Sequence, residues 1–97
     1  MYDYTGWIVR ATAGRDKDGI FVTVGVDQIK NRLLLADGKR RKFAHPKAKK
    51  LGHVTALTDR QSMYDHPVIR SLQKGEPVSD RALRRAPAAF KEGSTLG

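Results

Sequence analysis

The sequence predicts a small β-barrel followed by a short helical extension. Short runs rich in β-branched and apolar residues recur through residues 1–58, with glycine-containing turns between them and no helical periodicity. The pattern changes after Thr58, where helix start and stop signals begin. A chain of 97 residues has no room for two independent cores. We therefore expect a barrel over residues 1–58 and an extension over residues 59–97.

The first two strands are predicted on either side of a polar loop. Residues 6–11 combine a leading glycine with aromatic and β-branched side chains. Residues 13–19 contain two glycines and alternating charges, which is typical of a loop. In residues 20–26 every even-numbered position is isoleucine or valine, so these side chains share one face of a strand. Gly25 predicts a bulge or a sharp bend in that strand.

The third and fourth strands are predicted to form a hairpin. Residues 33–36 are apolar, and Asp37-Gly38 follows them as a strong signal for a tight turn. We expect the return strand over residues 39–43, with Phe43 holding it against the core and Pro46 ending it. A short fifth strand near residues 54–57 would complete the barrel, and closure would remove exposed strand edges.

Two helices are predicted in the extension. Residues 66–74 begin with a proline in the first turn and are followed by Gly75, and their apolar residues (Val68, Ile69 and Leu72) share one face. Ser79 is a suitable N-cap for a second helix over residues 80–86. Its apolar side would contain Leu83 and Ala86, with Arg81, Arg84 and Arg85 outside. Pro87 should end or kink this helix, and residues 91–97 should fray.

The positive charge is concentrated in one segment. Residues 39–50 contain seven lysines and arginines and no acid. Like charges held side by side repel one another, so this density favours a binding role over a merely solvated face. Mounted on a hairpin, the cations would keep their positions without an ordering cost on binding.

The composition points to a polyanionic partner. Nineteen lysines and arginines against ten acids give a net charge of +9 and a pI near 10.3, which favours nucleic acid over an acidic membrane. No apolar run approaches the ~20 residues needed to span a bilayer. Residues 1–6 lack the features of a signal peptide, and the chain has no cysteine. We therefore expect a cytoplasmic monomer without a membrane role.

Catalysis and metal binding have little support in the sequence. We find no nucleophile elbow, phosphate-binding loop or dinucleotide fingerprint, so we expect no enzyme activity and no cofactor. The three histidines lack metal-ligand spacing, and Asp16 and Asp18 fit turn formation better than calcium binding. Trp7 should pack in the core, which leaves Tyr2 and Tyr4 as candidates for base stacking.

Two segments together resemble the KOW motif. Residues 6–17, followed by the strand containing Phe21 to Val24, are similar to that motif, and the later Asp37-Gly38 and basic run extend the similarity over residues 5–55. The chain resembles small bacterial KOW-domain RNA-binding proteins, which are related to archaeal and eukaryotic large-subunit ribosomal proteins. One departure is that Asp18 stands where the motif usually has glycine, with Gly19 one position later.

The resemblance implies an SH3-like barrel and an RNA partner, with ribosomal RNA the first choice. Ribosomal proteins or RNA polymerase are possible further partners, because a KOW barrel can also serve as a protein-interaction module. Duplex DNA would suit the charge equally well. The residues we expect at the RNA are Arg15, Lys17, Lys39, Arg40, Arg41, Lys42, His45, Lys47, Lys49 and Lys50.

Overall fold

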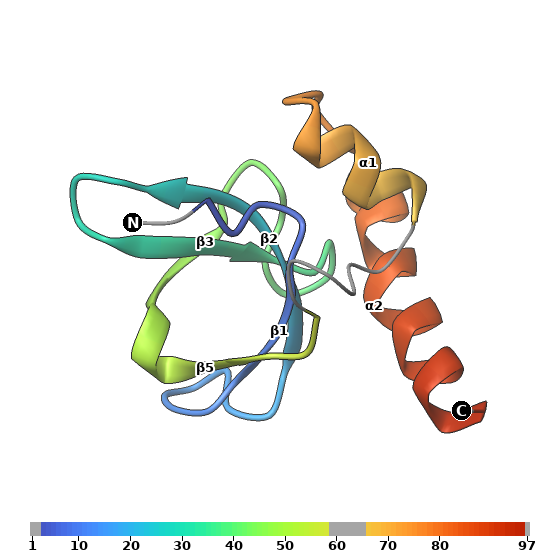
Figure 1. Cartoon of the computed structure of the whole chain (residues 1–97), viewed down its shortest axis with the longest axis horizontal. Coiled ribbons are helices and arrows are strands. Elements are labelled where there is room, and N and C mark those ends of the chain that lie inside the picture. The colour runs from blue at the N-terminus through green and yellow to red at the C-terminus, as the bar shows by residue number, and fades with distance from the viewer. Residues whose placement is uncertain (1–2, 59–65, 97) are drawn as a thin grey trace.

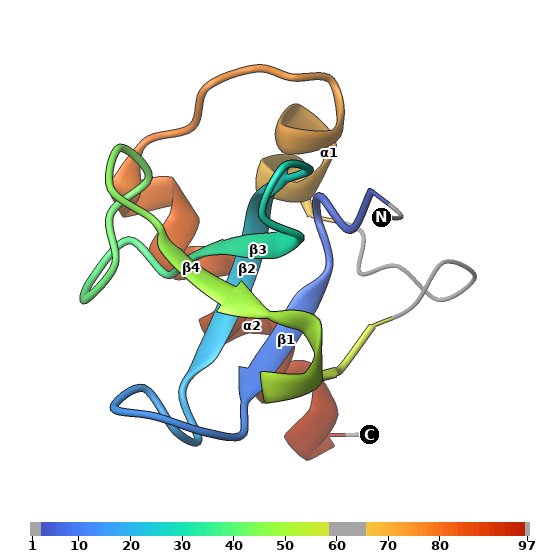
Figure 2. The ribbon, with the colours of Figure 1, turned by 90° about the vertical axis from the view of Figure 1, so that its left-hand side faces the viewer.

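The sheet contains all five strands in one antiparallel arrangement. The computed structural model describes residues 3–58 and 66–96, with side chains described as far as residue 88. The strand order is β4-β3-β2-β1-β5, with β5 labelled in Figure 1 and β4 in Figure 2. In chain order, the elements of the protein are β1 (Ile8–Ala11), β2 (Ile20–Asp27), β3 (Arg32–Ala36), β4 (Lys47–Lys50), the 3₁₀ helix η1 (Leu51–His53), β5 (Val54–Ala56), α1 (Pro67–Gln73) and α2 (Asp80–Leu96). The predicted order of a β-sheet body and two C-terminal helices is confirmed.

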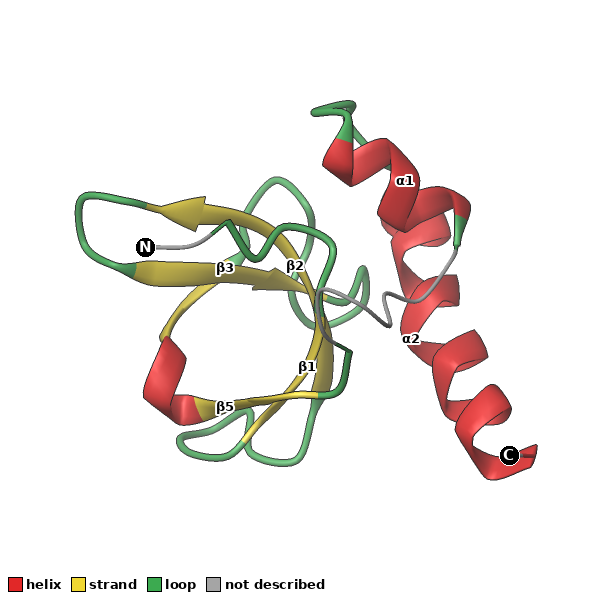
Figure 3. Cartoon of the chain, in the orientation of Figure 1, coloured by secondary structure: helices red, strands yellow, loops and turns green. Residues whose placement is uncertain are grey.

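The sheet curls, and its three central strands, β1, β2 and β3, bury residues on both faces. Alternation along a strand sends neighbouring side chains to opposite faces, and in β1 Ile8 and Val9 enter different clusters. The inner face is filled by the strands' own residues, Val9, Ala11, Phe21, Leu33 and Leu35. The outer face packs against both helices, which lie on one side of the sheet (Figure 3). Here Ile8, Val22 and Ala36 meet Val68, Ile69, Leu72, Leu83 and Ala86.

A bulge at Gly25 changes which face β2 presents. The pairing with β3 runs from Thr23 opposite Leu35 directly to Gly25 opposite Leu34, so Val24 is an extra residue. Val24 packs against the helix-side cluster, whereas Val26 packs against the inner one. The predicted bulge is therefore confirmed, but the single face expected for residues 20–26 ends at Val24.

The fourth strand lies four residues after the predicted return strand ends. Residues 39–43 form bends and a turn, and the strand β4 begins at Lys47, directly after Pro46. Pro46 therefore precedes the strand instead of ending it. β4 pairs antiparallel with β3, with Leu33 opposite Lys49 and Leu35 opposite Lys47. The expected hairpin exists, but its connection is a ten-residue segment, residues 37–46, which we call the basic loop.

The helices begin as the sequence predicts. α1 has Pro67 in its first turn and ends at Gln73, with Lys74 as its C-cap. α2 is capped by the Ser79 hydroxyl, which accepts from the Ala82 amide at 3.1 Å.

The predicted end of the second helix at residue 86 is wrong, because α2 continues through Pro87 to Leu96. Residues 91–96, which the sequence predicts to fray, are likewise part of this helix. A proline inside a helix removes one backbone hydrogen bond. The Pro87 ring is buried, and burial of its apolar surface offsets part of that loss.

Strand pairing does not close the sheet into a barrel. In the described part of the chain, the edge strands β4 and β5 are joined by η1 and by no ladder. The sheet nevertheless curls far enough for Val54 of β5 to pack against the inner cluster that contains Leu33 and Leu35 of β3.

Candidate nucleic-acid interface

The basic loop is organised by one carboxylate at its start. Oδ1 of Asp37 accepts hydrogen bonds from the backbone amides of Lys39, Arg40 and Arg41 at 2.9, 2.9 and 3.0 Å. The Arg41 carbonyl in turn accepts from the amides of Asp37 and Gly38, both at 3.0 Å. Aspartate commonly captures nearby amides in this way. These hydrogen bonds to Asp37 produce a wider loop in place of the tight turn that Asp37-Gly38 predicts. They also fix the backbone that carries Lys39 and Arg40.

The same loop is fixed to the start of α2. The Phe43 amide donates to Oδ1 of Asp80 at 2.7 Å, and the Phe43 ring packs against the helix-side cluster. Gly38 has a φ of +77°, and a Cβ there would collide with the carbonyl oxygen of Asp80. Only glycine fits this close approach in the left-handed conformation. Phe43 thus holds the segment against the core as predicted, but from a turn.

Two contacts join the segment 37–50 to the β1–β2 loop (residues 12–19). Nη2 of Arg41 lies 3.0 Å from Oδ2 of Asp16, whose side chain is 6% exposed, against 32% for that of Arg41. Nζ of Lys49 donates to the Ala13 carbonyl at 2.7 Å. Both loops consequently lie on the same side of the molecule, at the left in Figure 2. The loop that carries Arg15 and Lys17 is therefore joined to the basic segment by Arg41 and Lys49.

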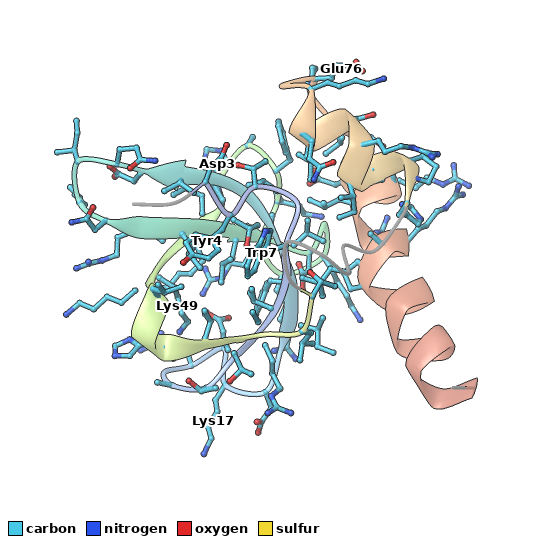
Figure 4. The ribbon with its side chains drawn as sticks, in the orientation of Figure 1. Asp3, Tyr4, Trp7, Lys17, Lys49 and Glu76 are labelled. Carbon is cyan, nitrogen blue, oxygen red and sulfur yellow. The ribbon has the colours of Figure 1, made fainter. Side chains whose placement is uncertain are left out.

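The predicted site residues divide into two groups by exposure. Arg41 is half-buried and Lys49 is buried at 8% exposure, because each reaches across to the β1–β2 loop. Lys42 is exposed and also donates to the Gly38 carbonyl at 3.2 Å. Lys17 extends away from the body in Figure 4. The exposed members are Arg15, Lys17, Lys39, Arg40, Lys42, His45, Lys47 and Lys50.

The aromatic candidates pack against the protein itself. The rings of Tyr4 and Trp7 meet edge to face, with centroids 4.8 Å apart and planes at 81° (Figure 4). Both side chains are half-buried against the inner cluster. This position agrees with the packing role predicted for Trp7 and gives Tyr4 the same role, whereas Tyr2 lies outside the described residues.

Sequence reasoning did not identify the aspartates that position the cations. The sequence assigns Asp16 to a turn and Asp37 to a hairpin signal, and it places Asp80 only at the first position of the second helix. Each also contacts the basic segment, and Asp16 and Asp80 do so from 25 and 37 residues away. Only Asp37 stands next to the basic run in the sequence, so a local signal existed for Asp37 and none for Asp16 or Asp80.

Comparison with known proteins does not place the chain in a family. No protein-family model matches the sequence, and no curated protein matches it either. Among residues 3–58 and 66–96, no helix has the length and apolar character needed to cross a membrane. The same residues contain no group of three or more histidines and acids arranged to hold a metal ion.

Proposed function

We propose that this protein is a non-enzymatic RNA-binding protein that docks on structured RNA, with ribosomal RNA the first candidate. In this proposal the curled sheet is an SH3-like barrel of the KOW type, and the ribosome in the cytoplasm is where the protein acts. The observation that carries the proposal is that the two loops and β4, which carry exposed cations, are joined by the Arg41–Asp16 ion pair and the Lys49–Ala13 hydrogen bond. Arg15, Lys17, Lys39, Arg40, Lys42, Lys47 and Lys50 are all exposed, and Asp37 holds the backbone amides of Lys39 and Arg40.

Phosphate is the ligand that this surface fits best. Arginine can grip a phosphate with two hydrogen bonds, and lysine acts as a point charge. Structured RNA is recognised largely by its backbone and shape, because its major groove is too narrow to read. A surface of preset cations suits such recognition because few side chains need to be ordered on binding.

The alternative, a protein-interaction module, would need an exposed apolar surface for its partner. Its contact surface would be the C-terminal helices, with an apolar interface on Val68, Ile69 and Leu72, but these residues are only 5%, 1% and 5% exposed. These residues pack against the sheet and against α2. A protein partner such as a ribosomal protein or RNA polymerase would therefore have to bind elsewhere.

The proposal is tested by salt dependence and charge reversal. If about five cations reach phosphates, log K for a structured RNA should fall with log salt at a slope of roughly −3 to −4. The double variant K39E/R40E should weaken binding by about 100-fold at physiological salt, since two contacts are lost and two repulsions are added.

The matched control is K30E/K74E, which makes the same change in net charge at two exposed lysines in the β2–β3 turn and after α1. Equal losses in the two double variants, or an affinity that does not respond to salt, would contradict the proposal. Competition with DNA of the same length and shape separates the partners, and preference for DNA would assign the surface to DNA.

A further inference from the structure

A groove separates the basic loop from α2. Its volume is about 320 Å³, and it is lined by Ile20, Asp37, Lys39, Arg84, Pro87 and Ala88. The basic loop is attached to α2 beside this groove, because the Phe43 amide donates a hydrogen bond to Asp80 and Gly38 packs against the Asp80 backbone. The two walls of the groove therefore belong to one rigid surface.

The groove combines apolar and cationic walls. Pro87 is buried and Ile20 half-buried, and both carry hydrocarbon side chains. Lys39 on the loop and Arg84 on the helix are exposed. The Arg84 side chain runs close to the loop, since a Cβ on Gly38 would lie 3.0 Å from its Cγ. A ligand in the groove would meet hydrocarbon and a cation from each side.

The acids near the groove are already engaged. Oδ1 of Asp37 accepts from three backbone amides, and Oδ1 of Asp80 accepts from the Phe43 amide. The exposed residues of the first turns of α2 add further positive charge through Arg81 and Arg85. An anionic ligand therefore meets more cations than acids when it approaches from the helix side.

We propose that this groove takes one unpaired nucleotide of the bound RNA. Its base lies against Ile20, Pro87 and Ala88 with the Arg84 guanidinium over it, and its phosphate lies beside Lys39. Unpaired bases in RNA are commonly splayed out and stacked on arginine planes, whereas a paired backbone alone would leave the hydrocarbon surface unused. The inference rests on the proposed function and extends it, because it makes α2 part of the RNA surface.

The test compares two RNA hairpins that differ only by one bulged nucleotide. The wild-type protein should bind the bulged hairpin about tenfold more tightly, as expected for one added base contact. Arg84→Gln should reduce that ratio to about one. Lys74→Gln, which removes one exposed lysine after α1, should keep the wild-type ratio.

A second pair of variants tests the groove without removing a cation from it. Ala88→Glu adds a carboxylate to an exposed helix position in the groove, and Gln73→Glu makes the same change in charge on α1. Ala88→Glu should abolish the preference for the bulge, and Gln73→Glu should keep it.

Equal binding of both hairpins by the wild-type protein, or an unchanged ratio in Arg84→Gln and Ala88→Glu, overturns the inference while leaving RNA binding intact. Absence of binding to either hairpin overturns the proposed function as well, so the two failures are distinct.

Discussion

The two halves of the basic segment carry similar charge but are held in place by different means. The basic loop depends on side-chain carboxylates, because Asp37 captures its amides and Asp80 and Asp16 anchor it to the helix and to the β1–β2 loop. β4 depends on backbone pairing with β3. The loop's geometry is therefore sensitive to single side chains far away in sequence, whereas the strand, apart from the buried Lys49, should tolerate changes in the side chains it carries.

This difference shows how a highly basic surface can be kept in one shape. Cations repel one another, so a loop that carries Lys39, Arg40 and Lys42 in near succession needs acceptors for its backbone. Asp37 and Asp80, which supply these acceptors, are half-buried, and Asp16, which accepts from the Arg41 side chain, is only 5% exposed. The outer surface thus keeps its positive charge.

The largest expected effect is on the attachment of the loop to α2. Gly38→Ala should lower the free energy of unfolding by about 2–4 kcal/mol, because it combines a left-handed backbone with a collision against Asp80. The matched control is Gly75→Ala, at nearly the same φ of +78° but with nothing within 4 Å of the added Cβ. That variant should cost about 1 kcal/mol. Urea denaturation measures both, and equal losses would mean that the close approach contributes nothing.

A smaller effect is expected from the acid that shapes the loop. Asp37→Ala should lower the free energy of unfolding by about 1–2 kcal/mol, because three amides lose their acceptor. It should also weaken RNA binding by about tenfold, because Lys39 and Arg40 lose their fixed backbone.

The control for this variant is Asp27→Ala. Its Oδ1 accepts from the amides of Ile29 and Lys30 in the β2–β3 turn, both at 3.1 Å. We expect a similar loss of stability and an RNA affinity close to wild type. If both variants bind RNA equally well, the loop's shape does not matter for binding.

The smallest effects separate two neighbouring lysines of β4. Lys50→Gln should leave stability within about 0.5 kcal/mol of wild type and reduce the salt slope of RNA binding by about 1. Lys49→Gln should instead lower the free energy of unfolding by roughly 1 kcal/mol, because its ammonium bonds the Ala13 carbonyl, and should leave the slope unchanged. The reverse pattern would place Lys49 at the RNA.

The strands and helices follow from local patterns in the sequence. Alternating valines and isoleucines in residues 20–24, and the spacing of Val68, Ile69 and Leu72, reflect burial on one face, which periodicity reports directly. Ser79 and Gly75 mark helix ends by their own chemistry. These features need only neighbours a few residues away, so a sequence shows them.

The course of the basic segment could not be predicted in the same way. Residues 39–43 and 47–50 are both rich in cations, and strand propensity does not choose between them. Residues 39–43 form a loop and not a strand because the Asp37 side chain accepts from their backbone amides, and because Phe43 and Gly38 pack against α2. The exposure of Lys49 and Arg41 likewise depends on partners 25 or more residues away. Contacts between residues so far apart produce no periodic pattern in the local sequence, so sequence analysis does not detect them.

The helix-side cluster is built from both predicted parts of the chain, residues 1–58 and 59–97, so we expect the two parts to unfold together. Ile8, Val22 and Ala36 come from the strands, yet their neighbours on that face are helix residues such as Ile69 and Leu83. A fragment that stops at Thr58 would turn this apolar face to water and invite self-association. Heat or denaturant should accordingly melt sheet and helices together in a single transition.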